Sequence, residues 1–417
     1  MSRITWSDGD TGLVVKAAID DNFTEIYKRG FVSLENYLLD SDPDYTLAFQ
    51  RAVAALPEST GFEYGGGTIM LEGKDYTISE TIVIEKSIKI IGAGSDAGTR
   101  ISLADGSNCN MFEIGKRNST DPISVTMEGI RIEMLGTQEA GYSNIVLYNY
   151  IRHSHFNDLF LVHATAANLR MIQDVDGTKP HNNYFYGCAF EYGVGYSVEI
   201  EHDYNLNFNS CYFGFGVIGA ATQGIYIRMT AENLVISNCW FLPYNLAGCI
   251  KLNGPDHVRI INNVFGGTTG AVAGSAKIDL TGCLNVNIGG NIVEDGTHPY
   301  AVRVNANCEN IKIYDNIFTS YATAPYYFTD KSVVNCHDNI FKNALLQNNY
   351  GAGTIANGQT YVDVTHGIFT TPESVNVTPQ ENEAVWVSDV GASTFRINRV
   401  GSSGDLVCNW FAGIKTY

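Results

Sequence analysis

Two glutamates lie two residues apart in the stretch SVEIEHD, at Glu199 and Glu201. The apolar Ile200 between them indicates a strand with one buried face, so both carboxylates should point outward on the same side, with their backbones roughly 6.7 Å apart. Glycoside hydrolysis uses two such groups, one to protonate the leaving oxygen and one as base or nucleophile, with closer spacing for retention and wider spacing for inversion. The spacing therefore predicts an acid and base pair.

Other charged residues could tune or replace this pair. Arg228 falls one repeat further along the chain. Its charge would keep one carboxylate ionised and leave the other freer to hold a proton. Glu191 and Asp203 lie on either side of the pair in sequence and are the next catalytic candidates. Outward Glu and Arg side chains also form solvated ion pairs, so a purely structural role is the competing interpretation.

These residues belong to a repeated pattern. The phrase VRIINNVF at 258–265 returns as IKIYDNIF at 311–318, and six further copies end at Phe160, Phe190, Phe213, Phe241, Val293 and Phe341. Consecutive endpoints are 23 to 30 residues apart. Apolar residues alternate within each phrase and Gly or Asn separates the phrases, which is typical of strands joined by turns. A strand that recurs once per coil stacks in parallel on its neighbours, so we predict a parallel β-helix.

A column of residues two positions before each endpoint supports this register. It reads Asp158, Cys188, Cys211, Cys239, Asn263, Asn291, Asn316 and Asn339. Stacked Asn side chains can hydrogen-bond along such an array, and Cys makes a small apolar stack. A second column precedes the strands and reads Asn205, Asn233, His257, Asn285 and Asn310. We interpret both columns as structural.

Aligning the coils also aligns the strands that precede each phrase. Their outward residues are charged or aromatic, namely Glu199, Tyr226, Lys251, Asp279 and Arg303. We predict that the last four, with Tyr192, bind substrate, because sugar rings stack on aromatic faces and charged groups bind their substituents. A lyase on the same groove would use Tyr226 or Lys251 as its base, with Arg303 or a divalent cation neutralising a uronate carboxylate. Otherwise we expect no metal and no cofactor.

Composition excludes several classes of partner. The chain has 417 residues and a formal net charge of -18, so it offers no basic stripe for nucleic acid and is not attracted to an anionic membrane surface. It contains no apolar run long enough to insert into a membrane, and the start MSRITWSDGDTG lacks the apolar core of a signal peptide. We expect synthesis in a cytoplasm without a signal peptide.

The chain divides into four segments by pattern. Residues 1–30 carry helical apolar spacing and predict a short helical neck. Residues 31–345 hold the β-helix, with a capping helix at 43–56 that begins near Pro43 and ends before Pro57. Residues 346–357 are a predicted hinge. Residues 358–417 alternate strand by strand between turn signals, which predicts a small β-sandwich that serves in trimerisation or glycan binding.

The entry to the array is specific enough to suggest a family. A capping helix is followed by GGGT at 65–68, a Gly-x-x-Tyr segment at 73–76 and IKIIGAG at 88–94. Together with the Asn column, this order resembles the pectate-lyase-like right-handed β-helix superfamily. The resemblance covers roughly residues 40–345 and implies an all-β, single-stranded right-handed parallel β-helix. It does not fix an activity, because that superfamily contains lyases, hydrolases, epimerases and adhesins.

The two ends narrow the resemblance. DGDTGLVVKAAIDDNFTEIY at 8–27 resembles the helical neck of bacteriophage tail proteins, and residues 360–400 resemble the C-terminal sandwich of phage tailspikes and fibres. The combination resembles a bacteriophage tailspike or polysaccharide depolymerase. That resemblance implies a homotrimer in the virion tail, attached to the tail or baseplate through its N-terminus and acting outside the cell on host surface glycans.

Three functions follow from these observations. The first is a tailspike-like protein that binds and hydrolyses a bacterial surface polysaccharide, such as capsule, exopolysaccharide or O-antigen, with Glu199 and Glu201 as acid and base. The second is a polysaccharide lyase that acts by β-elimination on the same groove. The third is a non-catalytic adhesin or tail fibre in which the sandwich recognises the glycan.

Overall fold

The computed structural model describes residues 30–58, 66–96, 98–115, 122–148, 151–172, 180–194, 196–215, 223–227, 231–243, 248–266, 275–294, 298–319, 324–341, 348–366 and 371–413. The predicted helical neck, residues 1–30, lies outside these ranges apart from Gly30. The chain is an all-β parallel solenoid of about seven turns followed by antiparallel sheets, which confirms the predicted fold class. Contacts divide it into two units, Met1–Cys239 and Trp240–Tyr417.

The first unit begins with a helical cap. A short 3-10 helix, η1 (Leu34–Tyr37), precedes α2 (Thr46–Ala55), which falls within the predicted range 43–56. Oδ1 of Asp44 accepts a hydrogen bond of 2.7 Å from the Thr46 N–H and so satisfies one free donor at the helix start. The buried face of α2 includes Phe49, whose ring packs edge-on against Tyr76 and Phe112 of the first coils.

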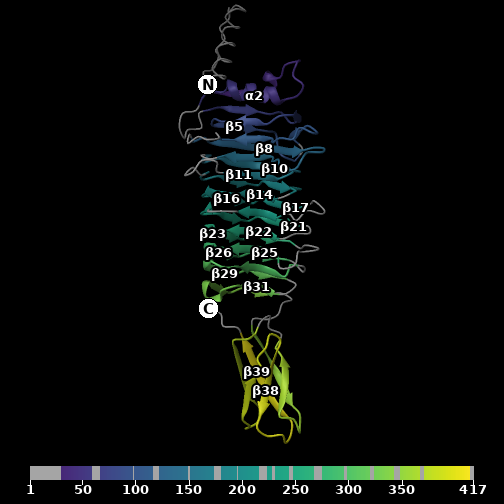
Figure 1. Cartoon of the computed structure of the whole chain (residues 1–417), viewed down its shortest axis with the longest axis vertical. Coiled ribbons are helices and arrows are strands. Elements are labelled where there is room, and N and C mark those ends of the chain that lie inside the picture. Colours follow the sequence, from purple (N-terminus) through teal and green to yellow (C-terminus); the bar gives the residue numbers. More distant parts are fainter. Residues whose placement is uncertain are drawn as a thin grey trace, which may run out of the picture. The chain divides into compact units, whose positions relative to one another are not determined.

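The coils of the first unit consist of short parallel strands in two sheets (Figure 1). The first sheet contains β1 (Phe31–Ser33), β2 (Thr68–Met70), β3 (Asp75–Ile78), β5 (Ile88–Ile91), β6 (Thr99–Leu103), β8 (Val125–Met134), β10 (His155–Val162), β12 (Tyr184–Tyr186), β13 (Ala189–Glu191), β15 (Asp203–Tyr204), β16 (Asn207–Asn209), β17 (Tyr212–Phe215), β19 (Ala231–Glu232) and β20 (Val235–Ser237). The second contains β4 (Ile82–Ile84), β7 (Phe112–Ile114), β9 (Ile145–Tyr148), β11 (Ala167–Ile172), β14 (Tyr196–Ile200) and β18 (Gln223–Ile227).

Inward side chains of consecutive coils stack on one another to form the core. Phe156 stacks on Phe185 with ring centroids 4.7 Å apart, and Phe185 stacks on Phe208 at 5.0 Å. All three rings are at most 1% exposed. Each coil therefore buries its apolar face only where the next coil covers it, as the repeat pattern predicted.

Corners between strands adopt left-handed backbone. All five residues of the second predicted column have φ between 51° and 62°. Asn tolerates this conformation better than most residues because its short side chain hydrogen-bonds locally, so the column is structural as predicted.

Asp158 also has a positive φ, of 48°. The register pairs Phe160 with Ala189, not with Phe190. The predicted alignment was therefore wrong by one residue in this coil, and Leu159 takes the place assigned to Asp158.

The second unit continues with strands of the same two kinds (Figure 1). One set contains β21 (Trp240–Pro243), β23 (Asp256–Ile261), β24 (Val264–Phe265), β26 (Leu284–Gly289), β27 (Ile292–Val293), β29 (Glu309–Tyr314), β30 (Ile317–Phe318), β32 (Val334–His337) and β33 (Ile340–Phe341), with the 3-10 helix η2 (Lys331–Val333) before β32. The other contains β22 (Gly248–Asn253), β25 (Ala276–Thr281), β28 (Tyr300–Val304) and β31 (Ala324–Phe328).

The predicted Asn ladder runs through this unit. Nδ2 of Asn263 donates to Oδ1 of Asn291 at 3.0 Å, Asn291 donates in the same way to Asn316 at 2.8 Å, and Asn316 to Asn339 at 3.0 Å. Asn291 and Asn316 are fully buried. The ladder satisfies amide groups that would otherwise be costly to bury.

The unit ends in two three-stranded antiparallel sheets. One has the order β34 (Asn348–Ile355), β39 (Leu406–Gly413), β36 (Ser374–Pro379), and the other β35 (Tyr361–Thr365), β38 (Thr394–Arg399), β37 (Val385–Ser388). Phe395, Ile397 and Trp410 lie in the core between them. Most of the predicted hinge, 346–357, is strand, because β34 pairs along its whole length with β39. The alternate residues Gly353 and Ile355 of β34 face the core.

None of the helices in the described part of the chain is long and apolar enough to cross a membrane.

Candidate active site

The predicted catalytic pair is brought together by an arginine that the sequence analysis missed. Glu199 lies on β14 opposite Arg170 of β11, and Glu201 directly follows β14. Nε of Arg170 is 3.0 Å from Oε2 of Glu199, and its Nη2 is 3.3 Å from Oε1 of Glu201. Arg170, on the preceding coil, therefore makes the contacts with the glutamate pair that were expected of Arg228. Arg228 itself lies outside the described residues. Tyr226 is opposite Glu199 in register, as the alignment of coils predicted.

Asp203 is enclosed within its coil. Its exposure is 0%, and its Oδ1 accepts a hydrogen bond from the Tyr204 N–H. Burial raises the pKa of Asp203 well above its usual range and outweighs the hydrogen bonds from Tyr204 and Asn183, which lower it. A side chain without solvent contact cannot reach a polymer, so Asp203 is a structural residue and not the catalytic one that its sequence position suggested.

The predicted substrate-binding residues of the second unit lie opposite one another on neighbouring strands, and two of them, Asp279 and Arg303, form an ion pair. Asp279 of β25 lies opposite Lys251 on one neighbouring strand and Arg303 on the other. Arg303 makes two contacts with the Asp279 carboxylate, one of them 2.9 Å from Nε to Oδ1, and Nδ2 of Asn305 donates to the same Oδ1 at 2.6 Å. The hydrogen bond to Asp279 raises the pKa of Arg303. These contacts agree with the structural interpretation of the outward charges, and substrate binding by Lys251, Asp279 and Arg303 stays a prediction.

A second cluster of charged side chains surrounds Glu191 in the first unit. Glu191 ends β13 opposite Val162 of β10, and Val162 lies opposite Glu133 of β8. The inward neighbours Phe190 and Ile132 are fully buried, which places both glutamates on the outward side of their strands. Two strand spacings separate their backbones, roughly 9.5 Å. Glu191 was predicted from the sequence and Glu133 was not, because Glu133 precedes the first repeated phrase that could be aligned.

Two arginines hold Glu133. Nε of Arg131 is 2.7 Å from Oε2 of Glu133, and Nη1 of Arg100 is 3.4 Å from Oε1. Arg100 lies opposite Arg131 in register and also forms a bidentate pair with Asp75. Glu133 is only 1% exposed. It therefore anchors the two guanidinium groups and does not face solvent itself.

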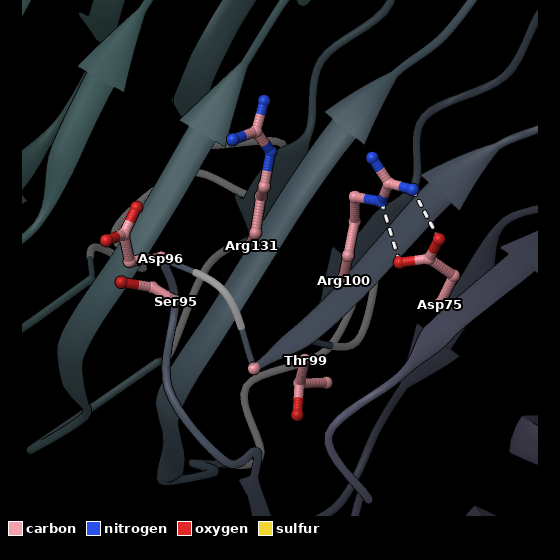
Figure 2. A pocket seen from close by; sticks show the side chains of 7 residues that line it. Asp75, Ser95, Asp96, Thr99, Arg100 and Arg131 are labelled. Atoms are coloured by element: carbon pink, nitrogen blue, oxygen red, sulfur yellow. Dashed lines mark hydrogen bonds and ion pairs between the residues drawn. The ribbon is translucent and has the colours of Figure 1, made fainter.

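The same two arginines line a pocket of about 150 Å³ with Asp75, Ser95, Asp96, Gly98 and Thr99. Figure 2 shows the Asp75 and Arg100 pair on one side of this pocket, Ser95 and Asp96 on the other, and Arg131 between them. The Arg131 guanidinium also lies over the ring of Phe160, with Cζ 4.7 Å from the ring centroid. Arg131 is thus fixed by a carboxylate and an aromatic ring while it lines the pocket.

Glu191 has the electrostatics of a proton donor. The side chain is partly buried, and burial raises the pKa of the Glu191 carboxyl above its ordinary value. The positive charge of Arg131 lowers the same pKa by a smaller amount. A carboxyl group with a raised pKa keeps its proton to higher pH, which is the property that a general acid needs.

Two aromatic side chains follow the strands at this place. His163 comes directly after β10 and Tyr192 directly after β13, and their rings stack with centroids 5.2 Å apart. Both residues have left-handed backbone, with φ of 62° and 52°. Tyr192 is the one tyrosine among the described residues with positive φ, and bulky residues adopt this conformation rarely and at a cost. Tyr192 is 41% exposed, so this backbone presents its ring to solvent beside Glu191.

A glycine brings a further aromatic ring to Glu191. Gly214 of β17 lies opposite Glu191 in register. A Cβ atom on Gly214 would lie 2.7 Å from the ring of Tyr212 and 3.1 Å from Cγ of Glu191. The missing side chain is therefore what lets the Tyr212 ring approach Glu191. The site thus combines a carboxyl group with raised pKa, aromatic rings on two sides and a fixed arginine.

Among the described residues, no group of three or more His, Cys, Asp or Glu side chains could hold a metal ion.

The fold is similar to that of several bacteriophage proteins. The ORF18 protein of Geobacillus virus E2 has 14% identity and a TM-score of 0.59, over 95% of this chain and 80% of that one. An N-terminal fragment of bacteriophage Phi29 gene product 12 has 13% identity and a TM-score of 0.50, over 79% of this chain and 65% of that one. No protein-family model and no curated protein matches this chain.

A third similar structure is the tailspike protein gp49 of Acinetobacter baumannii bacteriophage Fri1, a capsular polysaccharide depolymerase. It has 12% identity and a TM-score of 0.39, over 92% of this chain and 85% of that one. The predicted parallel β-helix is confirmed, and the fold is shared with the two phage proteins of higher TM-score. At these identities the likeness concerns the fold alone.

Proposed function

We propose that this protein is a phage tail protein that binds a bacterial surface polysaccharide and depolymerises it by hydrolysis of a glycosidic bond. The single observation that carries the proposal is the environment of Glu191: a partly buried carboxyl group with a raised pKa, next to the exposed ring of Tyr192 and the fixed guanidinium of Arg131. The similarity of the fold to two phage proteins supports a phage protein.

In this proposal Glu191 is the general acid. It donates its proton to the glycosidic oxygen as the bond to the leaving sugar breaks. A water molecule adds to the sugar carbon and releases a proton to solvent, from which Glu191 is protonated again. The raised pKa keeps Glu191 protonated to higher pH than an ordinary glutamate. The charge of Arg131 limits that rise.

The surrounding rings bind sugar. Tyr192 follows Glu191 on the same coil and Tyr212 lies on the next coil, and sugar rings stack on such faces. On the adjoining leg of the coils, His155 and Tyr184 stack with centroids 5.1 Å apart, and Tyr186 is 59% exposed. These side chains extend the aromatic surface along the coils, which suits an extended polymer.

Most glycosidases use a second carboxylate as base or nucleophile. The backbones of Glu133 and Glu191 are roughly 9.5 Å apart by strand spacing. The two arginine contacts and 1% exposure of Glu133 assign it instead to positioning Arg131 and Arg100.

Glu199 and Glu201 are the alternative acid and base for the same reaction. A specific observation favours them: both carboxylates contact one guanidinium, that of Arg170, which brings them close together. Their side chains are 12% and 25% exposed, so a polymer can reach them.

Matched glutamine variants distinguish the two sites. Glu191→Gln removes the transferable proton and keeps the shape, so we expect depolymerisation to slow by about 10² to 10⁴, with polymer binding retained. Glu199→Gln and Glu201→Gln should leave the rate close to native. Reducing-end release from purified capsular and O-antigen polysaccharides measures the rate. A native rate for Glu191→Gln with a loss for Glu199→Gln would move the site to the alternative pair.

We also propose that three copies of the chain assemble. The outer face of the sheet β34, β39, β36 supports this proposal, because Tyr350 and Phe411 lie opposite each other on it and are 81% and 42% exposed. Exposed aromatic residues without charged neighbours suit a subunit contact.

A further inference from the structure

The other sheet of the sandwich presents a row of exposed side chains across all three of its strands. In the paired register, Tyr361 of β35 lies opposite Asn398 of β38, and Asn398 lies opposite Trp386 of β37. Trp386 is 50% exposed and Tyr361 is 44% exposed. Two strand spacings, roughly 9.6 Å, separate the backbones of the two aromatic residues, with an amide between them.

Contacts on this face hold the row in place. Nδ2 of Asn398 donates to Oγ of Ser388 at 3.0 Å, which orients the amide. Arg396, in the next row, has its Cζ 4.1 Å from the centroid of the Tyr361 ring, and its Nε is 2.7 Å from Oδ1 of Asp363. The face is therefore arranged before any ligand arrives, which lowers the entropic cost of binding.

The sandwich core does not need these aromatic side chains. Phe395, Ile397 and Trp410 already fill the space between the sheets, and strand alternation turns Tyr361 and Trp386 to the opposite side. Exposed apolar side chains that lie close together mark interaction sites more often than apolar side chains scattered singly over a surface. The alignment of Tyr361 and Trp386 across one sheet therefore indicates a binding site.

The residue composition of the two outer faces of the sandwich indicates which face suits a glycan and which suits a second copy of the chain. Residues 350–354, 374–378 and 407–411, which form the opposite sheet, include no charged side chain. The row beside Tyr361 contains Asp363 and Arg396, and Arg396 also reaches Asp389 at 3.3 Å. The centres of subunit interfaces are depleted of charged residues. Aromatic rings mixed with amide, carboxylate and guanidinium groups instead match the flat apolar faces and hydroxyl groups of sugars.

We propose that Trp386, Asn398 and Tyr361 form a polysaccharide-binding site that is separate from the site around Glu191. Sugar rings stack on Trp386 and Tyr361, and hydroxyl groups hydrogen-bond with Asn398 between them. Such a site would retain the polymer between cleavage events. The inference concerns binding alone, so it does not depend on whether the chain hydrolyses the polymer.

Affinity electrophoresis of the full-length chain tests the site. Purified capsular and O-antigen polysaccharides are cast separately into native gels run on ice, and retardation is measured against polymer concentration. Trp386→Ala should need about tenfold more polysaccharide for the same retardation, which corresponds to about 1.4 kcal/mol. Tyr361→Ala should show a loss in the same direction. Val400→Ala is the matched control, because Val400 is a 75% exposed apolar residue of the sandwich outside the row.

Three results would overturn the proposal. The first is native retardation of both Trp386→Ala and Tyr361→Ala. The second is a change in the number of assembled copies by light scattering in either variant, which would make the row a subunit contact. The third is the absence of retardation of the native chain by every polysaccharide in the panel. Thermal unfolding of each variant confirms that a loss of retardation reflects the site and not the fold.

Discussion

At the scale of single residues, Glu191 differs from the other acidic side chains of the outward face in what surrounds it. Glu133 and Asp279 are held by arginines at 2.7 Å and 2.9 Å, as structural carboxylates commonly are. Glu191 is partly buried beside aromatic rings, and Arg131 acts on it only as a nearby charge. Burial therefore dominates its pKa, which is the condition under which a carboxyl group serves as an acid.

The pH dependence of cleavage should report this balance. The acid works only when protonated, so kcat/KM should fall as the pH rises through the pKa of Glu191. Arg131 lowers that pKa, and Arg131→Met should therefore move the alkaline limb of the profile to higher pH. Arg51→Met, which changes an arginine of the helical cap, should leave the limb unchanged. A limb that stays in place or moves to lower pH in Arg131→Met would remove Glu191 from this role.

Asp203 should affect stability and not catalysis. Its pKa is raised by burial, so the folded state binds its proton more tightly than the unfolded chain does. The stability from this proton is present below the ordinary pKa of an aspartate, about 3.9, and is lost as the pH rises from there towards the raised pKa of the folded state.

Asp203→Asn keeps the shape without the ionisation. We expect it to raise the unfolding temperature at neutral pH and to change it little in acid, with cleavage unaffected. Thermal unfolding at several pH values measures this. An unfolding temperature that is lower at neutral pH than in acid, relative to the native chain, would contradict the assignment.

At the scale of elements, the coils were predictable wherever the repeat is regular. The Asn ladder and the left-handed corners follow from residue type alone, because Asn, Asp and Gly are the residues that tolerate those conformations. The alignment was wrong by one residue at Asp158 because HSHFNDLF also ends in a Phe, and periodicity does not distinguish Phe160 from Leu161. The partner of Glu199 and Glu201 was missed because Arg170 lies on the preceding coil, in the less regular stretch ANLRMI.

The Glu191 site was less predictable than the coils for a physical reason. A raised pKa depends on burial, which the sequence does not state. The approach of Tyr212 depends on the absence of a side chain at Gly214, and the contribution of Arg131 depends on which strands become neighbours. Residue types and strand alternation predict which side chains face outward, but not which of them are then covered.

The interior of the Asn ladder should contribute more to the free energy of unfolding than its end does. Asn291→Ala removes the acceptor of two hydrogen bonds from Asn263 and the donor to Asn316, leaving buried polar groups without partners. We expect a loss on the order of 3 kcal/mol in the free energy of unfolding. Asn339→Ala, at the partly exposed end of the column, should cost less because water can replace the lost bonds. Chemical denaturation compares the two, and an equal or larger loss for Asn339→Ala would contradict this account of the ladder.

At the scale of the whole molecule, we propose different partners for different surfaces. In this proposal the coils around Glu191 receive the polymer for cleavage, and one outer face of the sandwich holds polymer. The other outer face is the proposed contact with further copies of the chain.

The assembly should depend on the uncharged face of the sandwich. Light scattering should give three copies of the native chain per particle and fewer for Tyr350→Ser combined with Phe411→Ser, because these exposed rings would lose their apolar contacts. The control, Trp386→Ala, should keep three copies. A native monomer, or a double variant that still forms the full assembly, would contradict the proposed subunit contact.

The masses of the products test hydrolysis by Glu191 most directly. The native chain and Glu191→Gln are incubated with each purified capsular and O-antigen polysaccharide, and the released fragments are weighed by mass spectrometry. We expect the native chain to release fragments that have gained one water, and Glu191→Gln to release none. Fragments that lack a water and carry a new double bond would show a lyase, and a polysaccharide that is bound but yields no fragments would show an adhesin; either result would contradict hydrolysis by Glu191.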